Sequence, residues 1–485
     1  MNKFALLICL VFLAFTALCQ NTFDITISDT SYQKLSQVME SNDSYVIVST
    51  RGNINSNNHH THLLRIDLGG KILNSKLMKP DAYFYALYKL IEFGDGYLGF
   101  GYQKDSINAN PFITIAEMNS DFLIVNEKHY ETNYTGISYV EVLKSIDNIV
   151  IFYSGITDSY QHQLCAYKIS NDLDTICSKR YSSSGTKLTF DILSSDNNDL
   201  TKVFVRGFAQ YTNTPSQILM MDSSLNISAI KGIPEGIGLY IDAKPLDDYR
   251  YILTGKKTVW NSSPQDDQMA IALMDAMDSL LSFEMLGAPD TLDYPGVFGN
   301  MDFKDSDNIF YAGTKNFSQN GIFANSEAWF VLNKLNSSLE LQWQKFYGGN
   351  ANYQLIDMIS TQDGGCLVAG NRYDYQTSIN ETDIYIVKVN EDGLIVGTGE
   401  ELPNISVQDA IVYPNPGNES FTIQSGPQIN GALFELFDMN GNLVLTTTLD
   451  ERVETISATS LSTGTYPYRI TFNNKIVGSG KWVKK

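Results

Sequence analysis

The chain has 485 residues, 43% of them hydrophobic and 18% charged, so it can form sizeable cores in one large and one small domain. Its formal charge of −20 argues against nucleic-acid binding, which needs a basic surface. Tyr (28), Phe (25) and Gly (35) are abundant, and Val, Ile and Thr recur in short runs, which predicts strands and tight turns.

Residues 1–19 predict a secretory signal peptide. Lys3 supplies the positive charge, residues 4–18 form an apolar run, and Ala17-Leu18-Cys19 is a cleavage site that would leave Gln20 first. A membrane anchor is one alternative, but the run is short for a bilayer span. A lipoprotein is another, although Leu18 is bulky for a lipid-attachment site. We expect no integral membrane segment after cleavage.

Residues 20–398 contain one sequence pattern that is repeated seven times. An apolar strand ending in Gly or a small residue recurs about every 50 residues, as YVIVSTRG (45–52), GYLGFG (96–101), NIVIFYSG (148–155), KVFVRG (202–207), YRYILTG (249–255), NIFYAG (308–313) and GCLVAG (365–370). A more amphipathic strand precedes each one, and two further strands follow it. Repeats of four strands are typical of a β-propeller, so we predict an all-β, seven-bladed propeller.

Closure of the ring can be predicted as well. The sequence NTFDITISDT followed by YQKLSQVMES has the same order as LELQWQKFYGGN followed by YQLIDMIST, an outer strand and then an inner one. Residues 23–28 are therefore expected to supply the outer strand of the last blade.

Long loops follow the Gly-ending strands, at 102–110, 156–162, 256–268, 314–326 and 371–381. In an antiparallel meander these loops emerge on one face, where variable loops on a rigid scaffold usually carry binding. They and their neighbours contain aromatic residues that could stack on sugars or anchor a protein partner, namely Tyr102, Tyr160, Tyr211, Trp260, Phe317, Tyr373 and Tyr375. The alternative is that these rings pack the loops onto the blades.

Sequence motifs for catalysis, cofactors and metals are absent: there is no HExxH, GxSxG, P-loop or dinucleotide fingerprint. The cluster His59-His60-Thr61-His62 is interpreted as a solvated loop rather than a metal site, and the Asp- and Asn-rich turns as hairpins rather than Ca²⁺ loops. Asp266-Asp267 and Asp374 are candidate carboxylates for glycoside chemistry. Two functions stay open: a non-enzymatic module that binds a glycan or protein, and a secreted polysaccharide hydrolase or lyase.

Three cysteines remain after signal cleavage, too few for a disulfide scaffold. Cys165 and Cys177 flank a turn and could form a disulfide across a hairpin. The alternative is two buried free thiols.

After a polar linker at 399–410, residues 411–485 follow a different pattern of short alternating strands. The segment contains Tyr413-Pro414-Asn415-Pro416, then Leu436-Phe437-Asp438 with Asn440-Gly441, a strong hairpin signal, and ends in a basic strand. Its length suits a small immunoglobulin-like β-sandwich.

This segment resembles the C-terminal sorting domain (type A) of the type IX secretion system of Bacteroidetes. The resemblance rests on Tyr413, Pro414, Asn415, Pro416, Asp438, Gly441, Leu461, Gly464, Tyr466, Arg469, Lys481, Lys484 and Lys485. Asn442 departs from the family, which often has Lys or Arg there. The resemblance implies export through the periplasm to the cell surface or the medium, with the secretion translocon and a sortase as partners. The repeats also resemble degenerate propellers that are common passengers of this system.

Overall fold

The computed structural model describes residues 21–28, 31–53, 58–79, 81–185, 189–194, 200–206, 216–259, 266–288, 291–318, 321–376, 381–395, 410–425, 431–439, 441–450, 453–472 and 475–485. The predicted signal peptide and nearly all of the predicted linker lie outside these residues. Contacts divide the chain into two compact units, Met1–Val396 and Gly397–Lys485. Within the described residues, no helix has the length and hydrophobicity that a membrane crossing requires.

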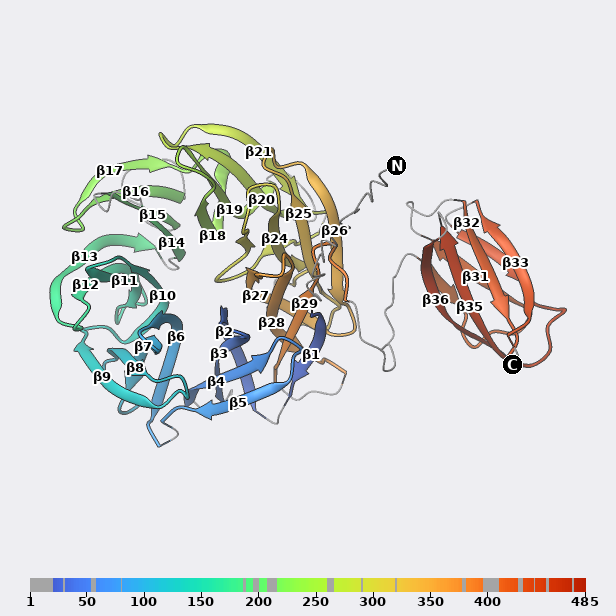
Figure 1. The fold of residues 1–485 in the computed structure, drawn as a ribbon, viewed down its shortest axis with the longest axis horizontal. Helices are drawn as coiled ribbons and strands as arrows, with labels where there is room; N and C mark the ends of the chain where they lie inside the picture. The colour runs from blue at the N-terminus through green and yellow to red at the C-terminus, as the bar shows by residue number, and fades with distance from the viewer. Residues whose placement is uncertain are drawn as a thin grey trace, which may run out of the picture. The chain divides into compact units, whose positions relative to one another are not determined.

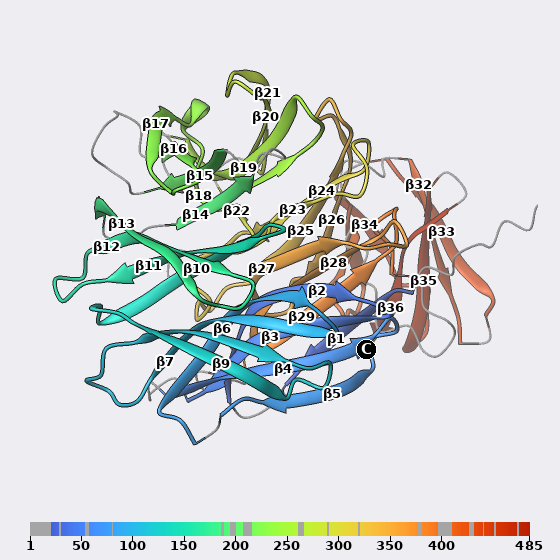
Figure 2. The same cartoon turned by 60° about the vertical axis from the view of Figure 1, so that its left-hand side comes forward.

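The first unit is a ring of antiparallel four-stranded blades, as the repeats predict (Figures 1 and 2). The first three blades contain β2 (Tyr32–Ser41), β3 (Ser44–Gly52), β4 (His59–Asp67) and β5 (Ile72–Leu77); β6 (Phe84–Phe93), β7 (Gly96–Lys104), β8 (Phe112–Met118) and β9 (Ile124–Glu131); and β10 (Gly136–Lys144), β11 (Asn148–Ile156), β12 (His162–Ser170) and β13 (Thr175–Gly185). The fourth and fifth contain β14 (Thr189–Ser194), β15 (Leu200–Arg206), β16 (Ser216–Asp222) and β17 (Ile227–Gly232); and β18 (Gly238–Pro245), β19 (Arg250–Val259), β20 (Asp266–Asp275) and β21 (Leu280–Leu286). The sixth contains β22 (Tyr294–Pro295), β23 (Met301–Asp302), β24 (Ile309–Lys315), β25 (Trp329–Leu335) and β26 (Leu341–Gly348).

The seventh blade joins the two ends of the ring. It combines β27 (Asn352–Ser360), β28 (Cys366–Tyr373) and β29 (Asp383–Val389) with the N-terminal strand β1 (Phe23–Ile27). β1 runs antiparallel to β29, with Phe23 opposite Lys388 and Ile27 opposite Ile384. The predicted closure by residues 23–28 is therefore confirmed.

The cores of the ring lie between blades. Each of the seven apolar clusters of the first unit draws its buried side chains from two consecutive blades, the last and first included. In β29, Ile384 and Ile386 face the first blade, whereas Tyr385 and Val387 face the sixth. This explains why the central strands read as continuous apolar runs: both of their faces are buried.

The Asp- and Asn-rich turns that follow the third strands of the blades share one geometry. In six blades the side-chain oxygen of an Asp or Asn residue accepts hydrogen bonds of 2.7–3.0 Å from the backbone N–H groups two and four residues later. The accepting residues are Asp67, Asn119, Asp222, Asp275, Asn336 and Asn390. The residue three positions after each has a positive φ. Gly70 and Gly393 adopt this positive φ without strain, because glycine has no side chain. Leu225 and Leu339 also have a positive φ there, and their side chains are buried between blades.

The inner strand of the sixth blade is interrupted. Between β22 and β23 the chain turns toward the centre of the ring, where the Phe298 N–H donates to the Ile356 carbonyl at 2.8 Å. Tyr139 from the third blade reaches this segment, since its hydroxyl donates to the Val297 carbonyl at 2.7 Å and its ring lies 5.2 Å from that of Phe298. The segment therefore bridges blades on opposite sides of the ring.

The second unit is a β-sandwich of two sheets. One sheet contains β30 (Ala410–Tyr413), β31 (Ser420–Ser425) and β34 (Val453–Ser457), and the other β33 (Leu443–Leu449), β32 (Ala432–Phe437), β35 (Gly464–Phe472) and β36 (Lys475–Lys484). Their shared core includes Phe421 from the first sheet and Phe434, Ile470 and Trp482 from the second, all fully buried.

Of the two states that the sequence leaves open, the structure has the free thiols: Cys165 is free and buried, and Cys177 is free and half-buried. β12 and β13 do pair, but Cys165 lies opposite Arg180 and Cys177 opposite Lys168. Cys165 packs in the cluster between the second and third blades, and Cys177 against the cluster between the third and fourth. The two side chains therefore point to opposite faces of the sheet, which no disulfide can span.

Candidate functional site

An aromatic row crosses the face that carries the loops between second and third strands, here called the long-loop face. Neighbouring ring centroids are 4.7–6.1 Å apart along the series Tyr373, Phe323, Tyr32, His59, Phe84, Tyr102 and Tyr88. The row connects the sixth, seventh, first and second blades. Residues at strand starts, such as Tyr32 in β2 and Phe84 in β6, alternate with residues in or beside the loops.

The row is partly open to solvent. Phe84 and Tyr373 are buried, whereas Tyr32, His59, Phe323 and Tyr102 are half-buried. Burial raises the pKa of Tyr102 to about 12. Half-exposed rings fixed by their neighbours form an ordered stacking surface.

A second aromatic group lies on the same face of the fifth and sixth blades. The Tyr294 ring is 6.3 Å from that of Tyr240 and 5.4 Å from that of Phe317. Three sequence-predicted rings, Tyr102, Tyr373 and Phe317, thus belong to aromatic groups on this face.

The other predicted aromatic residues do not join these groups. Tyr160 is 80% exposed in the turn after β11, and Tyr375 is half-buried after β28; the described residues give neither a ring contact. Tyr211 and Trp260 lie outside the described residues. Tyr32, Phe84 and Tyr88 were not predicted as ligand-face aromatics, because they lie in strands rather than loops. His59 was considered only as part of the histidine cluster, and Phe323, although it lies in the predicted loop 314–326, was not singled out.

The candidate carboxylates are held in ion pairs and hydrogen bonds. Asp267 is fully buried and accepts from Thr258 Oγ1 at 2.6 Å, Tyr294 OH at 2.8 Å and Lys256 Nζ at 2.8 Å. Burial opposes ionisation, but these donors outweigh it and hold the pKa of Asp267 below its ordinary value. Asp374 pairs with Arg372 at 3.2 Å. These carboxylates are therefore committed to holding the loops.

The histidine cluster is in β4, not in a loop as predicted. His60 Nε2 lies 2.5 Å from Asn58 Oδ1, and His62 Nε2 lies 2.9 Å from Ser75 Oγ. Among the described residues, no group of three His, Cys, Asp or Glu side chains is placed to hold a metal ion.

A belt of carboxylates and an amide links the inner strands of successive blades. Each accepts backbone N–H groups of the next blade: Gln37 from Leu90, Asp191 from Ala243, Asp242 from Asn300 and Met301, Asp302 from Ser360, and Asp357 from Val38. Between the second and third blades a Lys89–Glu141 ion pair, 2.9 Å long, provides the link. Burial raises the pKa of Asp357 to about 7 and that of Asp191 well above its ordinary range.

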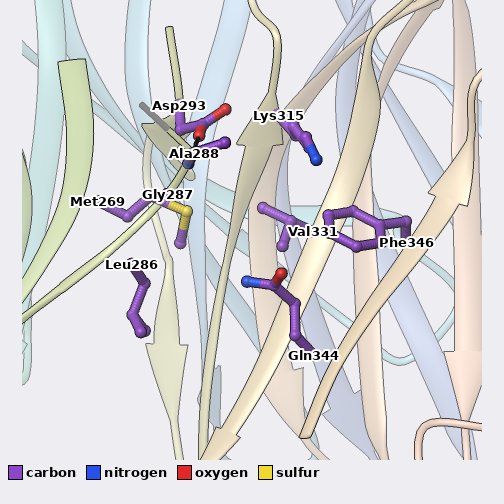
Figure 3. Close-up of a pocket in the computed structure, with 9 residues that line it drawn as sticks. All are labelled: Met269, Leu286, Gly287, Ala288, Asp293, Lys315, Val331, Gln344 and Phe346. Atoms are coloured by element: carbon purple, nitrogen blue, oxygen red, sulfur yellow. Dashed lines mark hydrogen bonds between the residues drawn. The ribbon is translucent and has the colours of Figure 1, made fainter. Parts of the chain in front are cut away.

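A small cavity lies between the fifth and sixth blades (Figure 3). Its volume is about 50 Å³, room for a water molecule rather than a sugar. Asp293 and Lys315 line it, but Asp293 accepts from Ala288, Thr291 and Asn316, and Lys315 Nζ lies 4.5 Å from the centre of the Phe346 ring. The cavity is part of the packing between blades.

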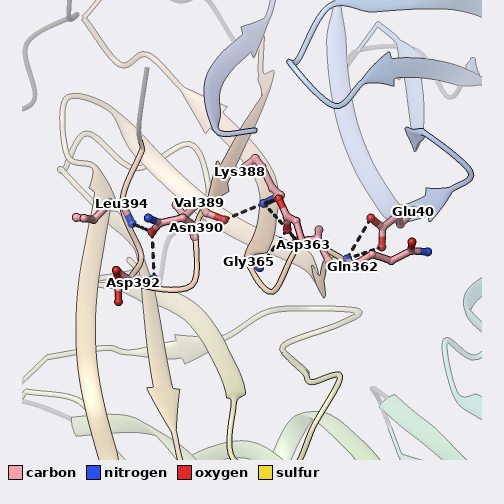
Figure 4. A network of polar contacts seen from close by, with 10 residues as sticks. Glu40, Gln362, Asp363, Gly365, Lys388, Val389, Asn390, Asp392 and Leu394 are labelled. Carbon is pink, nitrogen blue, oxygen red and sulfur yellow. Dashed lines mark hydrogen bonds and ion pairs between the residues drawn. The ribbon is translucent and has the colours of Figure 1, made fainter. Parts of the chain in front are cut away.

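The opposite face carries the short turns between first and second strands, and is here called the tight-turn face. Figure 4 shows its junction between the seventh and first blades. The Lys388 ammonium, fully buried, pairs with Asp363 at 3.0 Å, and the Gln362 N–H donates to the Glu40 carboxylate at 3.1 Å. The Gln362–Glu40 contact joins the last blade to the first, whereas the Lys388–Asp363 pair lies within the last blade.

In the C-terminal unit the first and last sorting motifs meet. Asn415 donates to the Lys481 carbonyl at 2.7 Å and accepts from the Val483 N–H at 3.0 Å, and the Trp482 indole donates to the Pro414 carbonyl at 2.9 Å. The start of the domain is thereby fixed along β36, the last strand.

The other motif residues of this unit have structural partners. Asp438 accepts from Gly441 and Asn442, Tyr466 OH donates to the Ser462 carbonyl, Arg469 pairs with Glu435, and Lys484 Nζ donates to the Ala458 and Leu461 carbonyls. Tyr413 lies in β30 opposite Thr422, Pro416 follows Asn415 through a cis peptide bond, and Gly464 lies opposite Lys484. Lys481 and Lys485 are exposed at the C-terminal end of the domain.

Comparison with known protein families identifies the C-terminal unit as the sorting domain that its motifs resemble. Residues 411–485 match the family model of the secretion system C-terminal sorting domain. The domain marks the chain for type IX secretion to the cell surface or the extracellular space. No curated protein matches the chain in sequence.

The solved structures to which this chain is similar include the following three. The polysaccharide lyase Uly1 is 10% identical over 74% of this chain and 90% of its own (TM-score 0.43). The β-propeller domain of the Trilobed protease from Pyrococcus furiosus is 10% identical over 76% and 100% (TM-score 0.41), and the WD40 domain of coronin from Toxoplasma gondii is 9% identical over 76% and 86% (TM-score 0.40). Likeness this distant carries no information on ligand or activity.

Proposed function

We propose that this protein is an extracellular or cell-surface binding module whose propeller recognises a glycan or a protein without chemical turnover. The aromatic row supports this proposal, because it places partly exposed, mutually fixed rings along the long-loop face. Ordered rings of this kind stack on sugars or anchor protein partners with little loss of side-chain freedom on binding. The chain would cross the inner membrane by its signal peptide and the outer membrane by its sorting domain.

The candidate acids also favour binding over catalysis. Asp267 and Asp374 hold loops, and the belt carboxylates accept backbone N–H groups between blades. A general acid or base must instead reach a substrate proton. Carboxylates that satisfy buried backbone donors have a structural role that chemistry would disturb.

A glycan array followed by affinity measurements on residues 20–485 tests the proposal. Tyr102→Ala and Phe323→Ala remove rings from the row and should weaken binding of any ligand found by about tenfold or more. Tyr249→Ala is the matched control, since this tyrosine is 75% exposed but lies in a turn of the tight-turn face. Equal binding by all three variants would contradict the role of the row.

The alternative is a polysaccharide hydrolase or lyase. It is favoured by one observation: burial raises the pKa of Asp357 to about 7, a value suited to a general acid. Release of new reducing or unsaturated ends from a polysaccharide by the wild-type protein, and not by Asp357→Asn, would replace the binding proposal with this one.

A further inference from the structure

The strand β33 lies at an open edge of the C-terminal unit. Its sheet has the order β33, β32, β35 and β36, and within the described part of the chain no strand pairs with its outer side (Figure 1). Natural proteins usually protect such an edge with charges, proline, bulges, covering segments or very short strands. β33 has only a bulge at its first residues, and its sequence LVLTTTL, Leu443–Leu449, contains no charge and no proline.

The other edges of the sandwich are protected. β36 contains three lysines, and its end is covered by Gly417. The Gly417 N–H donates to the Val483 carbonyl and the Gly417 carbonyl accepts from the Lys485 N–H, both at 2.9 Å. In the other sheet β34 contains Glu454, and β30 has only four residues.

The outer strands of the propeller blades are protected by charge as well. Each of β1, β5, β9, β13, β17, β21 and β26 contains at least one charged residue. Examples, one from each strand, are Asp24, Lys76, Glu127, Lys179, Lys231, Glu284 and Lys345. Among these outer strands and the sandwich edges longer than four residues, β33 is the one without a charge.

Exposed apolar side chains also gather at this edge. Leu443 is 51% exposed and Val444 38%, and Leu433 and Met439 of the same hairpin are exposed too. Most of the large apolar side chains that the described residues of this unit expose therefore belong to the β32–β33 hairpin. The remaining residues of β33 are mainly threonines, which favour strand pairing.

The charge of the unit allows two copies to approach each other. Residues 411–485 contain six Lys or Arg and six Asp or Glu residues, so their formal net charge is zero, whereas that of the whole chain is −20. A unit without net charge lacks the electrostatic repulsion that keeps proteins apart.

We propose that β33 is the surface through which two copies of this protein associate, by antiparallel pairing of their sorting domains. Antiparallel pairing of identical strands is two-fold symmetric, so the same patch serves both copies. A pair centred on Thr446 or Thr447 places Thr446 of one copy opposite Thr446 or Thr448 of the other, and no charges of the two strands meet. The inference does not depend on what the propeller binds. A dimer would carry two propellers and so bind a repetitive ligand with greater avidity.

Analytical ultracentrifugation of residues 20–485 tests the association. One pair of edge strands buries less than a standard interface, so the dimer should be weak, and the range from about 1 μM to about 500 μM should cover its formation. We expect the wild type to change from monomer to dimer over this range, and hydrogen exchange of the β33 amides to slow with it.

The decisive variants change both exposed threonines of β33. Thr446→Lys with Thr448→Lys, and Thr446→Glu with Thr448→Glu, each place like charges opposite one another and should raise the dissociation constant at least tenfold. An equimolar mixture of the two variants should form dimers again, because lysines then face glutamates, and this recovery also shows that both variants are folded. Ser457→Lys, at an exposed position of the other sheet, is the matched control and should associate as the wild type does.

Two results overturn the proposal. One is a wild type that stays monomeric at every concentration, and the other is a dimer that persists in both double variants and therefore uses another surface. If the wild type is monomeric and the double lysine variant is not exported while Ser457→Lys is, the edge accepts a strand of the export machinery in place of a second copy.

Discussion

The belt carboxylate Asp357 makes the stability of the propeller depend on pH. Its side chain is 7% exposed and accepts from the Val38 N–H at 2.7 Å and the Met358 N–H at 3.0 Å. Burial raises its pKa from 3.8 to about 7, against the opposing influence of Lys89. The folded chain therefore keeps this proton to a higher pH than the unfolded chain, and the free energy of unfolding should rise as the pH falls below about 7.

The size of the effect follows from the same shift. Each pH unit well between the two pKa values is worth about 1.4 kcal/mol, so moving from pH 8 to pH 5 should stabilise the folded state by about 2.7 kcal/mol. With an unfolding entropy of about 2.1 cal/mol/K per residue over roughly 370 residues, the melting temperature should rise by about 3 °C. Scanning calorimetry at pH 8, 7, 6 and 5 measures it.

Asp357→Asn isolates this contribution. The variant keeps an acceptor of the same shape but cannot titrate, so the difference between wild type and variant should grow by about 3 °C from pH 8 to pH 5. Glu141, whose pKa burial also raises, and His60, whose pKa burial lowers, titrate in both proteins and cancel in the difference. A parallel pH dependence of the two melting temperatures would refute the reasoning.

Three further outcomes are expected. Deleting residues 21–28 removes β1 and exposes β29, so the melting temperature of the propeller should fall by several degrees, whereas an unchanged value would argue against closure by this strand. Thiol titration of residues 20–485, unfolded without reductant, should find Cys165, Cys177 and Cys366 all reactive; a count of one would restore the disulfide. Asn415→Ala removes both hydrogen bonds to β36, so it should lower the stability of the sorting domain by about 1–3 kcal/mol. It should also reduce the amount of protein outside the cell. Normal export of the variant would show that these two hydrogen bonds are dispensable for secretion.

The blades could be predicted from sequence because their signal is local and repeated. A buried central strand such as Cys366–Tyr373, with apolar residues on both faces and tight turns at its ends, gives the same pattern in every repeat. The closing strand β1 was predictable for the same reason. β1 and β2 follow one another in the sequence as the outer strand β26 and the inner strand β27 do. The interruption of the sixth inner strand was not, because it depends on Tyr139 and Phe298, far apart in the sequence, meeting at the centre of the ring.

At the candidate sites, the features that sequence could not predict depend on strand register and on contacts between residues far apart in the chain. Cys165 and Cys177 flank a turn as predicted, but the pairing of β12 with β13 places them on opposite faces, which the residue types do not reveal. Phe84 carries no sign of a binding role in sequence, and His59 stands out only as part of a histidine cluster. Their rings become part of one surface only when β4 and β6 lie side by side.

The pairing of β1 with β29 also sets an order of events for a newly exported chain. The carboxylate of Asp24 meets the hydroxyl of Tyr385 at 2.8 Å across 361 residues of sequence, and such distant contacts form slowly. A chain that enters a compartment N-terminus first must keep β1 unpaired until the last blade arrives. The sorting domain follows that blade in the sequence. The signal for secretion is therefore present only on chains that already contain every strand needed to close the ring. We therefore expect that a chain truncated within the ring, which lacks both the closing blade and the sorting domain, is not released.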